Sequence, residues 1–239
     1  SEVAFLRSRD VAQYELKRIK SYMNHRLNAI REELFHLYLE QSNYGRELSE
    51  TDRTKTLFNR RDHLAAIAVI VGGEVQRYFL KEDAIRTQRP ESLLMRFKEI
   101  AKQLAATGFL MQRFDASMLG PSASLLPEGW YALAFSLKDD SGLDSIFLGV
   151  FRAGYVFPFC QYFSDGFGTV SAASFVLDDR GSVVCHSENK YAGLSFKDLP
   201  MFLTIRSAAD QAGAESPGTL VRYDNPAGAA VTAAEKKIV

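Results

Sequence analysis

Residues 64–79 read LAAIAVIVGGEVQRYF. An apolar run of eight residues, Leu64–Val71, ends at Gly72-Gly73, and apolar and polar residues alternate after it. Short apolar runs bounded by turn glycines are typical of paired strands. The stretch therefore predicts two antiparallel strands joined by a tight turn.

Similar patterns continue along the chain. We predict strands at 130–137 and 146–151, at 174–177 and 182–186, and at 219–223 and 229–236. Pro90 opens a helix that ends at Gly108, residues 115–129 form a loop, and a short aromatic helix is predicted from Tyr155 to Phe163. An antiparallel sheet with helices interposed defines an α+β fold.

The first forty residues predict one long amphipathic helix from about Val3 to Gln41. Its apolar positions recur at steps of three and four: Val11, Tyr14, Ile19, Tyr22, Met23, Leu27, Ile30, Leu34, Leu37 and Tyr38. At about 1.5 Å per residue it spans roughly 58 Å, longer than a domain of this size is wide. We expect part of it to pair with a second copy in a homodimer. The alternative is a helix packed only on its own domain.

A short second helix is predicted to run towards Arg61. We therefore divide the chain into residues 1–62, a signalling and dimerisation segment, and residues 63–239, a sensor domain.

The chain has 239 residues, 46% of them hydrophobic, and no net formal charge at pH 7. Proteins that bind phosphate backbones carry an excess of Lys and Arg, so no nucleic-acid partner is expected. The sequence contains no run of about 18 apolar residues. It starts and stops inside ordered-looking segments, and we expect membrane attachment through flanking segments.

The sequence has only weak matches to the motifs of catalytic sites. Ser122 lies in GPSAS, which lacks the second glycine of a nucleophile elbow. None of the four histidines, His25, His36, His63 and His186, lies three or four residues from another. We therefore expect no enzyme, no metal and no other cofactor.

Cys160 and Cys185 are the two cysteines of the chain. A disulfide between them would indicate an oxidising compartment, whereas two thiols would be small buried residues of a cytoplasmic protein. The sequence leaves both options open.

Aromatic residues are dense between residues 130 and 167. Ligand sites are mostly apolar with a few placed polar groups, and Trp130, Tyr131, Arg152 and Tyr155 are our candidates for ligand binding. The alternative is that these rings only fill the core.

One series of residues resembles the Cache family of extracytoplasmic sensor domains, which have a PAS-like fold. The series runs through Phe175–Phe196: Val176, Asp178, Gly181, Val183, Val184, His186, Gly193 and Leu194. A closing hairpin with its turn at residues 225–228 adds to the resemblance, which covers residues 63–239 behind the long helix.

The resemblance implies a periplasmic or extracellular receptor domain that binds a small molecule in a pocket of its sheet. Such domains signal through the membrane to a kinase, cyclase, phosphodiesterase or chemotaxis module. One subgroup binds amino acids with an Arg-x-Trp-Tyr segment and a later Asp. This chain keeps Trp130-Tyr131, but has Glu128 for the Arg and Arg152 near the position of the acid. Arg152 would instead attract a carboxylate.

We therefore predict the ligand-binding sensor domain of a transmembrane receptor, a non-catalytic region that passes ligand binding to the long helix. A cytoplasmic PAS-like or GAF-like dimerisation module without a ligand is the alternative.

Overall fold

The computed structural model describes residues 2–43, 50–59, 61–81, 90–104, 108–120, 129–138, 144–160, 175–177, 181–186, 191, 193–199 and 202–203. The chain forms two compact units, residues 26–156 and residues 1–25 with 157–239. This division crosses the first helix, and the boundary that we placed after residue 62 stays a prediction.

The predicted long helix is present as α1, Glu2–Asn43. Its 42 residues span about 63 Å at about 1.5 Å per residue. Among the predicted apolar positions whose burial the structure describes, Ile30, Leu34 and Leu37 are buried, and all three belong to residues 26–156. Nearer the N-terminus, Tyr14 is 65% exposed.

Residues 26–156 hold a five-stranded antiparallel sheet, which confirms the predicted α+β class. The elements after α1 are α2 (Glu50–Phe58), β1 (Leu64–Val71), β2 (Glu74–Leu80), α4 (Pro90–Leu104), β3 (Phe109–Phe114), the 3-10 turn η1 (Ala116–Leu119), β4 (Trp130–Lys138), β5 (Asp144–Arg152) and α6 (Ala153–Val156). The strand order is β2-β1-β5-β4-β3, so β5 is the central strand.

The predicted tight turn between β1 and β2 is confirmed. Val71 pairs with Glu74 across it. Gly72 and Gly73 have φ angles of +60° and +81°. Two consecutive positive φ angles are what a two-residue hairpin turn of type I′ requires, and glycine adopts them without steric strain.

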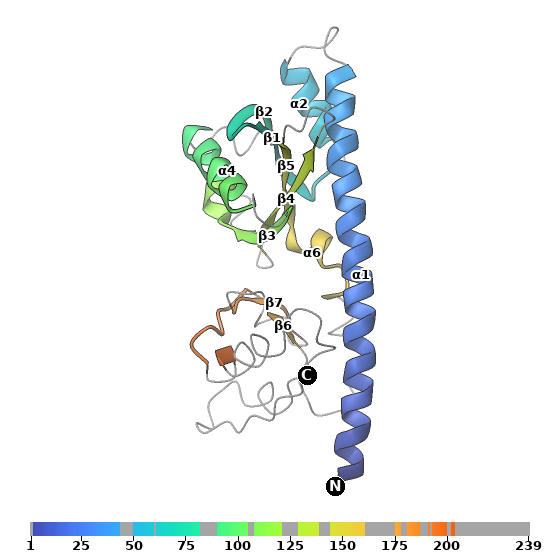
Figure 1. Cartoon of the computed structure of the whole chain (residues 1–239). Coiled ribbons are helices and arrows are strands. Elements are labelled where there is room, and N and C mark those ends of the chain that lie inside the picture. The colour runs from blue at the N-terminus through green and yellow to red at the C-terminus, as the bar shows by residue number, and fades with distance from the viewer. Residues whose placement is uncertain are drawn as a thin grey trace. The chain divides into compact units, whose positions relative to one another are not determined.

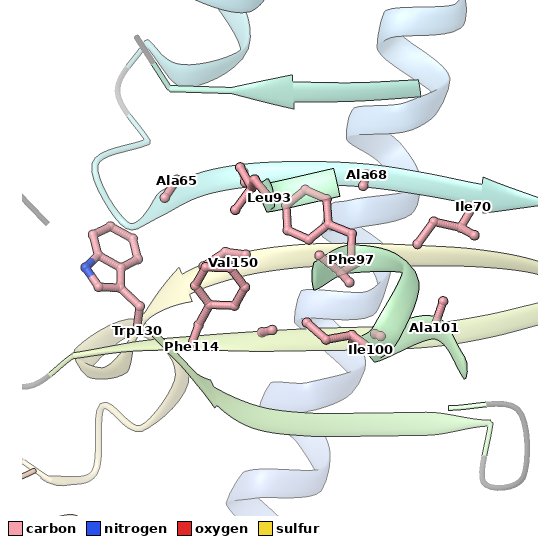
Figure 2. Packing of buried hydrophobic residues seen from close by; sticks show 14 of the residues in the cluster. Ala65, Ala68, Ile70, Leu93, Phe97, Ile100, Ala101, Phe114, Trp130 and Val150 are labelled. Carbon is pink, nitrogen blue, oxygen red and sulfur yellow. The ribbon is translucent and has the colours of Figure 1, made fainter. Parts of the chain in front are cut away.

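Helix α4 covers one face of the sheet (Figure 1). Its Leu93, Phe97 and Ile100 are buried against small residues of β1 and β4, such as Ala68 and Ala132. Figure 2 shows Phe97 and Ile100 pointing onto this face, with Trp130 and Phe114 at its end. The alanines leave room for the large side chains of α4.

The C-terminal half of α1 covers the opposite face (Figure 1). Because side chains alternate along a strand, Phe147, Gly149 and Phe151 of β5 share this face. Phe147 packs edge-on against Phe35 and Tyr38 of α1, with ring centroids 5.9 and 5.2 Å apart. The helix therefore crosses the central strand.

Gly149 is the point of closest approach between α1 and β5. A Cβ atom built on Gly149 would lie 2.7 Å from Cδ2 of Leu34 and 2.5 Å from Cε2 of Phe151. Both side chains are fully buried and have no space to retreat. Glycine is therefore required here by close packing.

Strand β3 was not predicted. Its sequence FLMQRF starts with three apolar residues in a row, so it lacks the alternation that marks a half-buried strand. Within the described residues it lies at the edge of the sheet and pairs with β4, from Phe109 opposite Phe135 to Phe114 opposite Trp130. Tertiary pairing, not local pattern, makes this segment a strand.

The predicted aromatic helix from Tyr155 to Phe163 is wrong in its bounds as far as residue 160, and its residues 161–163 lie outside the described part of the chain. The observed α6 starts earlier, at Ala153, and ends at Val156. Pro158 lacks a backbone N–H and disfavours helical geometry at the residue before it, Phe157, so the helix stops there.

The second unit contains the predicted hairpin of β6 (Phe175–Leu177) and β7 (Val183–His186). A disulfide joins Cys160 to Cys185 on β7, which settles the option that the sequence left open. In the same unit, Tyr22 of α1 packs edge-on against Phe159. The predicted closing hairpin at 219–236 lies outside the described residues.

Substitution of Gly149 tests the close approach of α1 to β5. We expect Gly149→Ala to destabilise the protein by about 1–3 kcal/mol, because overpacking a filled core has this effect. Leu34→Ala alone should also destabilise it, by about 2–5 kcal/mol. Combined, the two substitutions should cost less than their sum, since the smaller side chain at position 34 removes one of the two close contacts of the new methyl group and leaves only the contact with Phe151. Urea unfolding measures all three, and strict additivity would contradict the contact.

Candidate functional site

The four predicted ligand-binding residues lie at one end of the central strands but on two different faces. Trp130 of β4 is directly opposite Arg152 of β5, so their side chains share the α4 face. Tyr131 is opposite Phe151 and belongs to the α1 face. Tyr155, three residues beyond Arg152, lies in α6 and contacts Phe151 and α1. The structure thus brings together two pairs, not one group of four.

Trp130 and Tyr131 are buried, with 4% and 2% of their surface exposed. Trp130 packs into the cluster beneath α4 (Figure 2). Arg152 is only half-buried, and its backbone N–H donates to the carbonyl of His63 at 2.8 Å. Within the first pair, Arg152 is therefore the side chain with access to solvent.

Tyr155 is held to helix α1 at both of its ends. Its hydroxyl donates to Oε2 of Glu33, and its carbonyl oxygen accepts a hydrogen bond from Nε of Arg26 at 2.9 Å. Nε2 of His63 lies 3.3 Å from the other carboxylate oxygen, Oε1 of Glu33. One carboxylate on α1 thus joins α6 and the residue that precedes β1.

The ring of Tyr155 is enclosed on both faces. The His63 ring stacks on it with centroids 3.7 Å apart and planes 15° apart. Cζ of Arg26 lies 3.9 Å from the same centroid. Two groups this close cannot share one face, so the ring lies between an imidazole and a guanidinium, an arrangement that favours cation–π attraction. Phe151 adds a parallel neighbour at 5.7 Å.

The carboxyl of Glu33 has a pKa below its usual value of 4.5. Burial acts in the opposite direction, but hydrogen bonds from His63 and Tyr155 and the positive charges of His63 and Arg61 outweigh it. Burial and the adjacent Glu33 raise the pKa of Tyr155 to about 12. At neutral pH the pair is therefore a carboxylate accepting from a neutral phenol.

We define Arg26, Glu33, His63 and Tyr155 as the Tyr155 cluster. Sequence reasoning named Tyr155 as a ligand-binding candidate and missed the other three in this role. A usable signal was present: Arg26 and Glu33 are seven residues apart, which places them on the same face of a helix. Their partners come from residues 30 to 129 positions away, which no local pattern reveals.

In the part of the chain that the structure describes, no group of three or more His, Cys, Asp or Glu side chains is arranged to hold a metal ion. The described helices also include none that is long and apolar enough to cross a membrane.

Comparisons with known proteins found no matching family model and no match among curated proteins. Solved structures gave matches at low identity. The ligand-binding domain of the Pseudomonas aeruginosa PAO1 amino-acid chemoreceptor PctC, in complex with GABA, is 12% identical with a TM-score of 0.45, covering 88% of this chain and 87% of that one.

The sensory domain of the Campylobacter jejuni chemoreceptor Tlp3 (CcmL) is 10% identical with a TM-score of 0.46, covering 90% of this chain and 87% of the other. An extracellular ligand-binding receptor from Desulfohalobium retbaense DSM5692 is 12% identical with a TM-score of 0.46; the match covers 88% of this chain and 36% of that one. At TM-scores below 0.5, these similarities assign neither a ligand nor a family to this chain.

The lowered pKa of Glu33 predicts a loss of stability in acid. A carboxyl with a depressed pKa stabilises the folded state fully above its unfolded pKa, near 4.5, and this contribution disappears as the pH falls through the folded pKa. We expect Glu33→Gln to destabilise the protein at pH 5.5, and the difference from the unmodified chain to shrink below pH 4.5. Denaturant unfolding between pH 5.5 and 3 measures this.

The neighbouring Glu32, which is exposed on the same helix, provides the control. Glu32→Gln should leave the pH profile of stability unchanged. A difference between Glu33→Gln and the unmodified chain that stays constant down to pH 3 would contradict the assignment.

Proposed function

We propose that this chain is the ligand-binding sensor domain of a transmembrane signalling receptor, non-catalytic itself, in which α1 carries the signal. The observation that carries the proposal is the way α1 is built into the sheet unit. Its Ile30, Leu34 and Leu37 are part of the core, and its Arg26 and Glu33 bind the segment that follows β5. A displacement of the residues at the end of β5 would therefore be transmitted to α1 through these contacts.

The ligand is proposed to bind at the end of the sheet near Arg152. A half-buried guanidinium beside buried aromatic rings suits a small molecule with a carboxylate, because a charge-assisted hydrogen bond is stronger where water is partly excluded. Trp130 supplies the apolar wall on the α4 face. Tyr131 lies on the opposite face and supports the strand instead of facing the same ligand.

The disulfide supports an extracytoplasmic location. Disulfides persist in the periplasm and outside the cell and are rare in a reducing cytoplasm. The bond between Cys160 and Cys185 thus favours the receptor over the cytoplasmic PAS-like or GAF-like module. In this setting the chain joins the membrane through flanking segments.

The partner proposed for α1 is the same helix of a second copy. Tyr14 and Tyr22 are 65% and 42% exposed, and large exposed aromatic side chains are common at protein interfaces. A homodimer through α1 would cover them and would give the helix a neighbour against which it can move.

A ligand screen tests the sensor proposal. Purified protein is heated with amino acids, other carboxylates, amines and nucleobases, and we expect a saturable rise in melting temperature with a carboxylate. A ligand at about 100 times its Kd stabilises the folded state by about 2.7 kcal/mol. Arg152→Gln should abolish the rise, and Trp130→Phe should weaken it.

Arg96→Gln is the matched control, because Arg96 lies on α4 in an exposed ion pair with Glu99. It should keep the full response. A rise that survives Arg152→Gln would move the site elsewhere, and no rise across the whole screen would contradict the sensor proposal.

The location is tested through the cysteines. For a loop closed over 25 residues, removing the disulfide is expected to destabilise its unit by about 3.5 kcal/mol on the chain-entropy model. Urea unfolding of the unmodified chain and of the variant with Cys160→Ser and Cys185→Ser measures the loss. Thiol labelling in intact cells should find both cysteines blocked. Two reactive thiols in the native setting would contradict an extracytoplasmic location.

A further inference from the structure

Tyr155 lies lengthwise along helix α1. Its carbonyl oxygen meets Arg26 and its hydroxyl meets Glu33, and these residues are seven positions apart. At about 1.5 Å per residue, the Cα atoms of Arg26 and Glu33 are separated by about 10.5 Å along the helix axis. A residue fixed at two heights on a helix resists sliding of the helix as well as its separation.

Both contacts depend on one register. A slide of one helical turn, about 5.4 Å, would bring Ala29 or Leu37 to the place of Glu33. Neither side chain can accept a hydrogen bond, so the Tyr155 hydroxyl would lose its acceptor. The shifted helix would also leave His63 without the carboxylate that it contacts.

The steric fit of Leu34 against Gly149 selects the same register. Leu34 is next to Glu33 on the helix and meets the one position on this face of β5 that has no side chain. Because α1 runs across the strands (Figure 2), a one-turn slide would move Leu34 from Gly149 towards Ile67 of β1 or Leu133 of β4, which pair with Gly149 and are both buried. Apolar packing and the polar contacts therefore agree on a single position of α1.

The cluster is partly shielded from water, and its acidic group faces several basic groups. The side chains of His63 and Glu33 are 23% and 22% exposed. Arg26, His63 and Arg61 are the basic groups that act on Glu33 and Tyr155 from α1 and from the segment before β1. Arg26 is the first residue of this unit and Tyr155 is its last but one, so the cluster ties the two ends of the unit together.

We propose that Arg26, Glu33, His63 and Tyr155 form a latch that holds α1 in one axial register on the sheet, and that opening this latch is the step that lets α1 move. The existence of the latch is independent of any ligand. Its use in signalling rests on the proposed function, because α6 begins directly after Arg152 and a ligand there would displace Tyr155 through only three residues.

Distance measurements between spin labels test the latch without a ligand. The native cysteines form a disulfide, so labels attach only to introduced ones. One label is placed on α1 with Asn28→Cys and the second on the sheet side, with Gln76→Cys on β2 or Met95→Cys on α4; all three positions are exposed. Two reference positions separate a slide of the helix from a change at one label.

In the otherwise unmodified chain, diluted with unlabelled chain so that distances within one copy are measured, we expect one narrow distance distribution for each pair. Glu33→Gln combined with Tyr155→Phe removes the carboxylate and the hydroxyl while keeping both shapes. We expect a second population in both pairs, displaced in accord with an axial movement of about one turn. Loss of charge-assisted hydrogen bonds should shift the equilibrium between registers by about tenfold or more. Glu32→Gln should give the unmodified distribution.

One outcome overturns the latch: unchanged distances in both pairs, with only a lower melting temperature, would make the cluster a structural contact alone. The single variants Glu33→Gln and Tyr155→Phe keep the test decisive if the double variant does not fold, since each should increase the shifted population less than the pair does. If the spin-label distances contradict the latch, the result of the ligand screen is not affected. Equally, a failed screen leaves the register measurement valid.

Discussion

The contact between Leu34 of α1 and the bare backbone of Gly149 sets how closely the long helix approaches the sheet. Every other contact on this face depends on that distance. The rings of Phe35 and Tyr38 reach Phe147 only because the helix crosses β5 at its glycine. A side chain at this position would push α1 away from the sheet. The contacts of Tyr155 with α1, which lie further along the helix, would then be lost together.

The two faces of the sheet are packed differently. On the α4 face the strands supply several alanines among larger residues, and the helix supplies large side chains such as Phe97 and Ile100. On the α1 face, large side chains come from both the strands and the helix, because rings of α1 pack against a ring of β5. In LAAIAVIV of β1, two alanines and Ile70 face α4, whereas Ile67 and Val69 face α1.

The local sequence pattern predicted the helices and strands whose burial is periodic. It did not predict features that depend on contacts between residues far apart in the chain. The long helix, the hairpin of β1 and β2, and the pair of β4 and β5 have clear periods and turn residues, so they could be predicted. Strand β3 has no period of its own and exists through pairing with β4. The Tyr155 cluster was hidden for the same reason, because Glu33 and Tyr155 are 122 residues apart. Only the seven-residue spacing of Arg26 and Glu33 could be recognised in the sequence.

A polar cluster inside an apolar interface contributes specificity more than stability. Removing a carboxylate from water is unfavourable, and its hydrogen bonds roughly offset that loss, so an apolar replacement would often be as stable. The carboxylate reinforces the register that the fit of Leu34 against Gly149 already favours, because it must accept hydrogen bonds from both a phenol and an imidazole. Polar contacts can also be exchanged for water at small net free energy. A helix held this way has one preferred register, and the signalling movement that we propose would require these contacts to open.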